Sequence, residues 1–267
     1  MKQRATILLT NDDGCGAPGL RSLHAALVAE YDVVVAAPAR EQSGIGHAFT
    51  FNRPLRYTAL PQDSGMKGFC IEGTPSDCVK FAISHLLPRR PDAVVAGMNI
   101  GENSGISGYY SGTVAAAREG AFWRVPSIAF SVCAQAAEFA DAYARTALDI
   151  LNRILKTGPG QNGRCVFYNV NFPECAPAAC RGVKVTRQSL AFFDDRYRRV
   201  EAAGSADGYV VYGDKKDIEA LDTFDSRALL NRYITVTPLC FDATAEWALP
   251  LLAGLEESGS RRQGDQR

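Results

Sequence analysis

The strongest constraint on the fold is an apolar, β-branched-rich run near the N-terminus, Ala5–Thr10, that lacks alternating polar residues. A strand with one solvated face alternates apolar and polar residues, whereas a strand covered on both faces does not. Similar runs follow at 32–37, near 68–71, and at 93–96, 127–132 and 165–170. The sheet therefore needs helices on both faces, which favours a doubly wound α/β fold with a mostly parallel sheet.

Helical patterns separate these runs, as that architecture requires. Pro18 suits a first helical turn, and apolar residues recur at helical spacing behind it. Thr74 and Asp77 form a variant of the capping box and predict a helix start between them. The predicted helices cover 18–28, 75–87, a segment from about 113, and 137–156.

The last third of the chain follows a different pattern. Short polar stretches studded with aromatic residues cover 182–225 and predict hairpins that project from the core and contact another subunit. A strand at 233–238 and a final helix at 243–255 follow, and the last residues read as a solvated tail. We predict one domain over 1–255, with a core at about 5–180, an extension at about 181–230, a returning strand and helix at about 231–255, and a disordered tail at 256–267.

Composition limits the partners and the compartment. Lysine plus arginine equal aspartate plus glutamate at 29 each, so no overall field draws the chain to a nucleic acid polymer or a membrane. The N-terminus lacks a signal-peptide pattern, and no apolar run reaches spanning length. The eight cysteines are dispersed without a Cys-x-x-Cys pair, which favours reduced thiols and a cytoplasmic protein. A Cys175–Cys180 bridge is the alternative in an oxidising compartment.

Oxygen-bearing side chains follow several of the predicted strands. Asp12 and Asp13 follow the first strand, Ser43 lies after the second, and Asn99 follows 93–96. Ligands bind outside the carboxyl ends of strands in open α/β sheets, and these hard donors suit Mg²⁺, Mn²⁺ or Ca²⁺. The alternative is that Asn11–Gly14 is only a turn that caps the next helix.

A glycine-rich segment from Gly97 leads to a second candidate site at 111–113. A helix beginning near Thr113 offers free backbone N–H groups and a positive dipole end, which suit a phosphate. Asn103, Ser111, Gly112 and Thr113 could supply the donors that a phosphate dianion needs beside a metal ion. The alternative is that Ser111 and Thr113 only cap the helix.

A weaker signal points to another function class. Gly14, Gly16 and Gly19 match the Gly-x-Gly-x-x-Gly dinucleotide fingerprint, and Arg40 could contact a 2'-phosphate. No acidic residue closes the second strand to bind a ribose, so we rank an NADP-binding oxidoreductase lower. A nucleotide-binding protein without catalytic activity is the other alternative.

Five ordered motifs in the first half of the chain narrow these options. They are Asn11–Gly14 with Ala17–Gly19, Ala37–Pro38 with Gln42–Gly44, Gly73–Pro75 with Asp77–Cys78, Gly97-x-Asn99-x-Gly101-x-Asn103, and Tyr110–Val114. Together they resemble the SurE family of stationary-phase survival proteins. The resemblance is strong from Ala5 to about Val132 and thinner beyond.

The resemblance implies a metal-dependent 5'-nucleotidase. It implies a Rossmann-like core and a C-terminal extension that exchanges elements between subunits of a homodimer or homotetramer. It also implies hydrolysis of nucleoside 5'-monophosphates, often of 3'-monophosphates, and in some members of short polyphosphate. The family's ligands for one Mg²⁺ or Mn²⁺ per subunit fall on Asp12, Asp13, Ser43 and Asn99, and its phosphate loop falls near 111–113.

Departures from the family pattern lie close to these positions. Cys15 and Gly16 stand where many members carry a histidine, and Ala48 stands where a serine is common. These departures bear on substrate preference more than on the metal site.

The chemistry expected is phosphoryl transfer to water, assisted by the metal ion and by Asp12 and Asp13. Attack by one of these carboxylates to form an aspartyl phosphate is the alternative. His47, close behind Ser43, is a candidate acid for the leaving nucleoside oxygen, although a lone histidine is more often structural.

Overall fold

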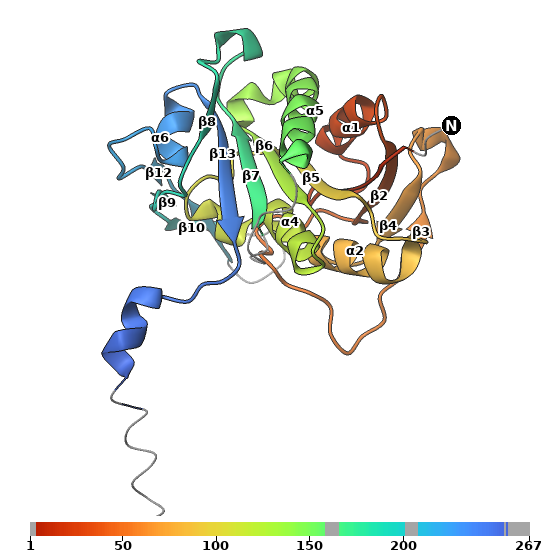
Figure 1. Ribbon diagram of the computed structural model, residues 1–267, viewed down its shortest axis with the longest axis horizontal. Coiled ribbons are helices and arrows are strands. Elements are labelled where there is room, and N and C mark those ends of the chain that lie inside the picture. The colour runs from red at the N-terminus through yellow and green to blue at the C-terminus, as the bar shows by residue number, and fades with distance from the viewer. Residues whose placement is uncertain (1–3, 158–165, 201–207, 254, 256–267) are drawn as a thin grey trace, which may run out of the picture.

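The computed structural model describes residues 4–157, 166–200, 208–253 and 255. Its centre is a nine-stranded sheet in the order β3-β4-β2-β1-β5-β6-β7-β13-β8 (Figure 1). β3 and β13 run antiparallel to β4 and β7, and the other neighbours are parallel, which confirms the mostly parallel sheet. The strands are β1 (Thr6–Thr10), β2 (Asp32–Pro38), β3 (Tyr57–Ala59), β4 (Gly68–Ile71), β5 (Ala93–Ile100), β6 (Ser127–Val132), β7 (Val166–Phe172), β8 (Val183–Val185) and β13 (Ile234–Cys240).

Helices cover both faces of this sheet, as the apolar strands predict. β1 shows the reason, because Ile7 and Leu9 pack in the core cluster on one face whereas Leu8 belongs to the cluster on the other. The helices α1 and α5 lie over the first face, and α2 and α4 lie over the second (Figure 1). The helices are α1 (Pro18–Leu27), α2 (Pro75–Phe81), α3 (Ser107–Tyr110), α4 (Gly112–Phe122), α5 (Ala140–Lys156) and α6 (Asp225–Leu230).

Small residues bring α4 close to the sheet. Ala115, Ala116 and Ala117 are buried, and a Cβ added at Gly120 would lie 2.3 Å from the hydroxyl oxygen of Ser127 in β6. The connection from β5 places the first turn of α4 at the carboxyl edge of the parallel strands. The fold therefore positions a helix N-terminus where ligands bind in such sheets.

Some boundaries differ from the sequence prediction. β5 continues through Gly97 to Ile100, so the glycine-rich segment is partly strand. The predicted helix 75–87 is α2 followed by a π-helical turn, Ala82–Leu86, and the predicted helix 137–156 is a 3₁₀ segment, Ala134–Phe139, followed by α5. Local pattern predicts that these elements exist better than it predicts where they end.

The final helix predicted at 243–255 is shorter in the structure and is not an α-helix. The structure has a 3₁₀ helix, Glu246–Leu252, on an arm that leaves the body of the molecule (Figure 1). Pro250 lies inside it, and a proline removes a helical hydrogen bond. The predicted tail at 256–267 and the predicted strand residue Cys165 lie outside the described residues.

The extension contains the predicted hairpins and two elements that were not predicted. β10 (Arg196–Val200) pairs with β11 (Gly208–Tyr212), and β9 (Phe192–Phe193) pairs with β12 (Lys215–Lys216). The unpredicted elements are β8, which joins the main sheet beside β13, and the short helix α6.

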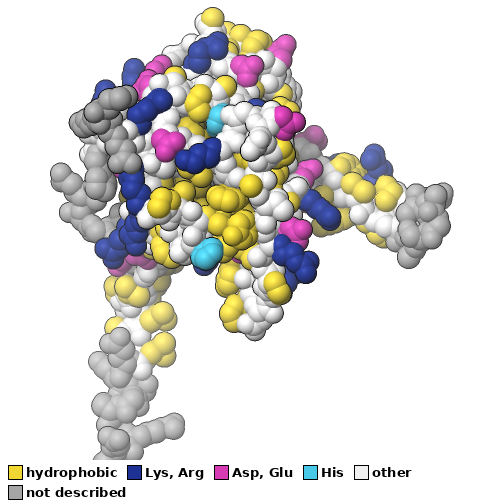
Figure 2. Space-filling model, turned by 90° about the vertical axis from the view of Figure 1, so that its right-hand side faces the viewer, with side chains coloured by type: hydrophobic (Ala, Val, Ile, Leu, Met, Phe, Trp, Pro, Cys, Tyr) yellow, Lys and Arg dark blue, Asp and Glu magenta, His cyan; other side chains and the backbone are white. Residues whose placement is uncertain are grey.

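Both edges of the main sheet end in strands of three residues, which limits pairing with other chains. At the β3 edge the Tyr57 ring contacts the rings of Phe69 and Phe81 at centroid distances of 5.7 and 5.3 Å. Figure 2 faces this side and shows hydrophobic side chains gathered among charged ones.

Within the described residues, no helix has the length and apolar character needed to cross a bilayer.

Candidate active site

The candidate site lies where the order of the strands reverses. The chain moves from β1 to β2 on one side and later returns to β5 on the other, so β1 and β5 flank the switch point. Asp12 and Asp13 follow β1, and Asn99 lies near the end of β5. The sheet therefore brings together residues that lie far apart in the sequence, as the ligand rule for such sheets predicts.

A tight turn presents both aspartates. The Asn11 amide donates to the carbonyl of Gly14 at 2.9 Å, and the Gly14 N–H donates to Asn11 Oδ1 at 3.2 Å. Gly14 has φ +107°, which favours glycine. This break of the strand allows two successive carboxylates to lie close enough for the charge of Asp12 to act on Asp13.

Asp12 lies against the N-terminus of α4. Only 3% of it is exposed, and the Thr113 hydroxyl donates to Asp12 Oδ1. A Cβ added at Gly112 would lie 2.8 Å from Asp12 Cβ and 3.0 Å from Asp12 Oδ2, so this contact requires glycine. Burial raises the pKa of Asp12, although hydrogen bonds from Thr113 and Gly112 oppose the shift.

Asp13 is half-buried beside two other carboxylates. Burial, followed by the charges of Asp12 and Glu41, raises the pKa of Asp13 to about 6. Glu41 was not among the predicted site residues, and the only sequence signal for it is its place two residues before Ser43. Within the described residues no lysine or arginine forms an ion pair with Asp12 or Asp13, so this acidic pair suits a bound cation.

Ser43 follows β2 and Asn99 lies in β5, and these two strands flank β1 on opposite sides. The Gln42 N–H donates to the carbonyl of Asp12 at 2.7 Å, which holds the Ser43 loop beside the turn. The exposed Ser43 hydroxyl donates to Glu41 Oε1 at 2.8 Å. Asn99 Nδ2 donates to the carbonyl of Gly101 at 2.6 Å, which leaves Asn99 Oδ1 as the acceptor that a metal ion needs.

The donors fit a hard divalent ion. Two carboxylates, one hydroxyl and one amide oxygen are ligands that Mg²⁺ and Mn²⁺ accept. In residues 4–157, 166–200, 208–253 and 255, no three side chains of His, Cys, Asp or Glu form a candidate metal cluster. A metal ion bound at this site would need the neutral oxygens of Ser43 and Asn99 as well as the two aspartates.

The first turn of α4 directs its backbone N–H groups at Asp12 and at the Ser111 hydroxyl. The Ser111 hydroxyl accepts a hydrogen bond from the N–H of Val114 at 3.1 Å, so Ser111 is the N-cap of α4. This is the capping role that the sequence offered as the alternative to phosphate binding. The same hydroxyl keeps its own hydrogen for donation. The N–H groups of Gly112 and Thr113 face the side of Asp12 and favour its ionised form.

Asn103 holds its loop in place. It is 7% exposed, its N–H donates to Asn171 Oδ1 at 2.7 Å, and its amide donates to Ser131 Oγ at 2.8 Å. Asn169 Nδ2 donates to the Asn103 carbonyl at 2.9 Å. The structure therefore uses Asn103 to fasten the loop to β6 and β7.

His47 lies beside the middle of α4. Its Nε2 atom is 2.9 Å from Glu119 Oε2, and its ring stacks on Phe122 at 5.1 Å. Glu119 lies seven positions after Gly112, which is roughly 10 Å along a helix. This geometry gives no support to the predicted acid role of His47.

The helix that begins after Thr74 borders the site. The predicted capping box is confirmed, because Asp77 N donates to the Thr74 hydroxyl and Asp77 Oδ2 accepts from Thr74 N. A Cβ added at Gly112 would lie 3.0 Å from Pro75 Cγ, so the first turn of α2 contacts that of α4.

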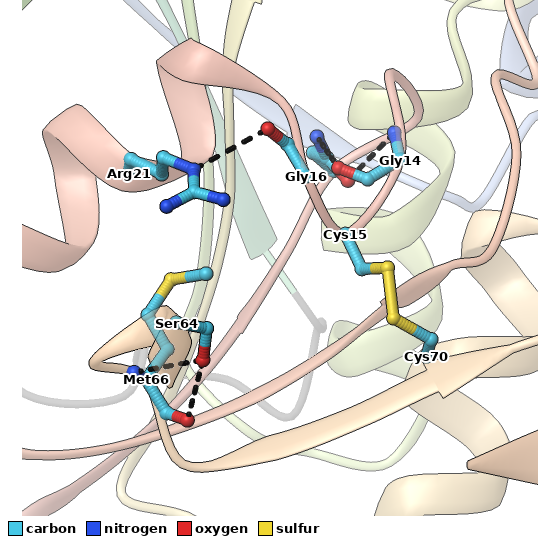
Figure 3. Close-up of a disulfide and its surroundings, with 8 residues drawn as sticks. Gly14, Cys15, Gly16, Arg21, Ser64, Met66 and Cys70 are labelled. Carbon is cyan, nitrogen blue, oxygen red and sulfur yellow. Dashed lines mark hydrogen bonds between the residues drawn. A yellow bond between two sulfur atoms is a disulfide. The ribbon is translucent and has the colours of Figure 1, made fainter. Parts of the chain in front are cut away.

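The prediction that all eight cysteines are reduced thiols is wrong. Cys15 and Cys70 form a disulfide with Cα atoms 5.7 Å apart (Figure 3). The Cys15 N–H donates to the carbonyl of Pro38, and Cys70 pairs with Ala37 in the sheet, so the turn after β1 crosses the end of β2 to reach β4. A separation of 55 residues conceals this pairing in the sequence. Cys175 and Cys180 are free, with sulfur atoms 3.7 Å apart.

The glycines of the fingerprint allow the turn after β1 and the packing of α1 against β5. A Cβ added at Gly19 would lie 2.0 Å from the Met98 carbonyl oxygen, so glycine allows α1 to contact β5. No atom lies within 4 Å of a Cβ added at Gly16, and Cys15 between these glycines is bonded to Cys70.

Comparisons with known proteins identify the family. The model of the family described as "Survival protein SurE" matches residues 7–195. The 5'-nucleotidase SurE of Syntrophobacter fumaroxidans is 41% identical over 245 residues, which cover 89% of this chain and 94% of that protein. The 5'-nucleotidase SurE 1 of Thermus thermophilus is 41% identical over 94% of this chain and 98% of its own length.

A solved structure shows the same fold. The crystal structure of the SurE protein from Aquifex aeolicus superposes with a TM-score of 0.79 at 34% identity, over 94% of this chain and 99% of that one. The sequence match and the structural match both extend beyond the core into the C-terminal third. The chain belongs to the survival protein SurE family.

Proposed function

We propose that this protein is a phosphomonoesterase that hydrolyses nucleoside 5'-monophosphates and requires one Mg²⁺ or Mn²⁺ per subunit. The observation that carries the proposal is the Asp12–Asp13 pair, which lacks a cationic partner within the described residues and faces the first turn of α4. The relatives named 5'-nucleotidase supply the substrate class.

Asp12, Asp13, Ser43 and Asn99 would hold the metal ion. When bound, such an ion polarises a phosphoryl oxygen and lowers the pKa of a water. The Thr113 hydroxyl fixes Asp12 in one orientation. The N–H groups of Gly112 and Thr113 favour the ionised form of Asp12. The free hydrogen of the Ser111 hydroxyl and the positive end of the α4 dipole would stabilise negative charge on a phosphoryl oxygen.

The two aspartates are suited to different tasks. Asp12 is buried and bonded to Thr113, so it serves as a fixed anchor. Asp13 is the more accessible carboxylate, so the alternative route through an aspartyl phosphate would use Asp13. Single-turnover trapping with ¹⁸O-labelled water separates the routes, because a labelled phosphate without a trapped protein adduct supports direct attack by water.

The proposal includes a broader substrate range and an assembly. It covers nucleoside 3'-monophosphates and short polyphosphate as further substrates. It also includes a homodimer or homotetramer formed through the extension and the C-terminal arm, because Trp247, Leu249 and Leu251 on that arm are exposed. Light scattering after size-exclusion chromatography tests the assembly, and Trp247→Ser should shift it towards the monomer.

The central experiment measures phosphate release from a panel of nucleoside monophosphates with Mn²⁺, with Mg²⁺ and with chelator. Asp13→Asn should abolish the release, whereas Asp32→Asn should not, because Asp32 is an exposed aspartate at the opposite end of the strands. Release that persists in chelator would contradict the metal dependence. Inactivity of the wild type with every metal and substrate would contradict the proposed reaction.

A further inference from the structure

The loop between β5 and α3, residues 101–106, lies between the candidate ligand Asn99 and the first turn of α4. From the core side, Asn103 fastens it to Ser131, Asn169 and Asn171. The opposite side of the loop contacts the extension, which lies more than 80 residues further along the chain. We call residues 101–106 the β5–α3 loop.

The extension holds the β5–α3 loop through several hydrogen bonds. Gln188 Nε2 donates to the Gly105 carbonyl at 2.8 Å, and Gly105 N donates to Asp225 Oδ2 at 3.1 Å. The Ile106 N–H donates to the Ala191 carbonyl at 2.9 Å. The extension therefore contributes directly to the shape of a loop at the candidate site.

Lys215 of β12 makes the charged contact in this set. Its ammonium group donates to Glu102 Oε1 and, at 2.9 Å each, to the carbonyl and hydroxyl oxygens of Ser104. An ammonium group has three N–H donors, so all three are directed at the β5–α3 loop. The Lys215 and Glu102 side chains are 18% and 17% exposed, so solvent screens this ion pair only in part.

A short path of contacts connects Lys215 to the candidate metal ligand. Glu102 is bonded to Lys215 and follows Gly101 directly, and the Gly101 carbonyl accepts the hydrogen bond that orients the Asn99 amide. Glu102 Oε2 also accepts from the Ser104 N–H at 2.7 Å, so the loop cannot shift at one residue alone. Lys215 is thus connected to Asn99 through Glu102 and Gly101.

We infer that Lys215 is a positioning residue, which acts through Glu102 and Gly101 to orient Asn99 towards the divalent ion. This inference rests on the proposed metal-dependent function, but it can be measured without turnover. Residues that orient a metal ligand typically change metal affinity by about 10- to 100-fold when they are replaced.

The test compares Lys215→Met, which removes the charge and keeps most of the stem, with Lys215→Arg and with Lys216→Met. Lys216 is the exposed neighbour on the same strand. The readouts are Mn²⁺ affinity by calorimetry, amide hydrogen exchange in the β5–α3 loop, melting temperature, and kcat and KM separately. If Lys215→Met does not fold, Glu102→Gln removes the other charge with little change in shape.

The inference expects Lys215→Met, or Glu102→Gln in its place, to weaken Mn²⁺ binding about tenfold or more and to raise exchange at 101–106. Lys215→Arg should recover part of the affinity, and Lys216→Met should match the wild type. Unchanged Mn²⁺ affinity beside a lower melting temperature would overturn the inference, because a purely structural contact gives that result. If the wild type binds Mn²⁺ but releases no phosphate, the proposed reaction fails and the affinity measurements still decide the role of Lys215.

Discussion

Two loops meet at the candidate site, and the chain holds them in different ways. The turn after β1, residues 11–15, is closed by Asn11 within its own sequence and is tied to β4 by the Cys15–Cys70 disulfide. The β5–α3 loop has polar contacts from β6, β7 and the extension. One side of the site is thus fixed by local structure and a covalent link, and the other side by hydrogen bonds from distant segments.

This difference separates the effects of mutations at the two sides. Changes in the turn should act on the aspartates directly, whereas changes in the extension should act through the loop and Asn99. The turn after β1 also contacts the first turn of α4, where a Cβ added at Gly112 would lie 2.8 Å from Asp12 Cβ.

The largest effect is expected from Gly112→Ala, which crowds Asp12 in the turn after β1 against the first turn of α4. The new Cβ would lie 2.8 Å from Asp12 Cβ and 3.0 Å from Pro75 Cγ. We expect activity to fall about 100-fold, because small displacements of reacting groups have effects of this size. Steady-state kinetics on phosphate release measures it.

Gly16→Ala is the matched control, because no atom lies within 4 Å of the added Cβ. The crowding argument fails if both glycine substitutions reduce activity equally.

Next in size is the loss of the disulfide from the turn. The double variant Cys15→Ser, Cys70→Ser should lower the free energy of unfolding by about 2–4 kcal/mol, since the link closes a long loop. Chemical denaturation measures this loss. Reductant should lower the unfolding free energy of the wild type to the value of the double variant. Cys240→Ser replaces an exposed free thiol and should leave stability unchanged.

The same double variant sharpens the comparison between the two loops. It should leave hydrogen exchange in the β5–α3 loop as it is in the wild type, because that loop has its own contacts. Increased exchange there would show that the two sides are coupled through the disulfide.

A smaller effect is expected from Asp225→Asn on the other side of the site. Asp225 is fully buried and accepts from Gly105 N and Ser189 N with its two oxygens. In Asp225→Asn, a side-chain NH₂ group replaces one of these oxygens, so one of the two backbone N–H groups loses its acceptor. We expect a loss of about 1–3 kcal/mol in the free energy of unfolding. Chemical denaturation measures the loss of unfolding free energy, and amide hydrogen exchange shows which segments lose protection.

Asp222→Asn provides the surface control for this change. Its ion pair with Lys184 is partly exposed, and such pairs contribute little to stability. An equal loss in both variants would contradict a specific role for the buried aspartate.

Sequence patterns predict the parts of the fold that depend on local burial. β4 and β6 match their predicted ranges, and β1 and α1 agree to within a residue at each end, because their apolar spacing directly reflects which faces are covered. The capping box at Thr74 and the turn at Gly14 are likewise local, and both are confirmed.

The features that were missed depend on distant partners. Nothing near Cys15 indicates Cys70, and nothing near Lys215 indicates Glu102, because only the folded sheet and extension bring these residues together. Glu41 was not predicted for a different reason. Its effect on Asp13 is electrostatic, and no sequence spacing identifies a residue that acts through its charge. The helix predicted at 243–255 forms only as a 3₁₀ helix over Glu246–Leu252, and Pro250 inside it removes a helical hydrogen bond.

The smallest expected effect is a pH-dependent change in stability at Asp13. Its pKa in the folded, metal-free protein is about 6, above the ordinary value of 3.8, so the folded state binds this proton more tightly than the unfolded state does. This contribution to stability is complete below pH 3.8 and is lost as pH rises through about 6. In metal-free buffer Asp13→Asn should therefore melt a few degrees above the wild type at pH 7, with the difference vanishing near pH 4. Mn²⁺ should reverse the order at pH 7, because it stabilises only a protein that retains both carboxylates. Thermal melts with and without Mn²⁺ measure both effects, and equal melting temperatures at pH 7 without metal would show that Asp13 is not held under repulsion in the folded state.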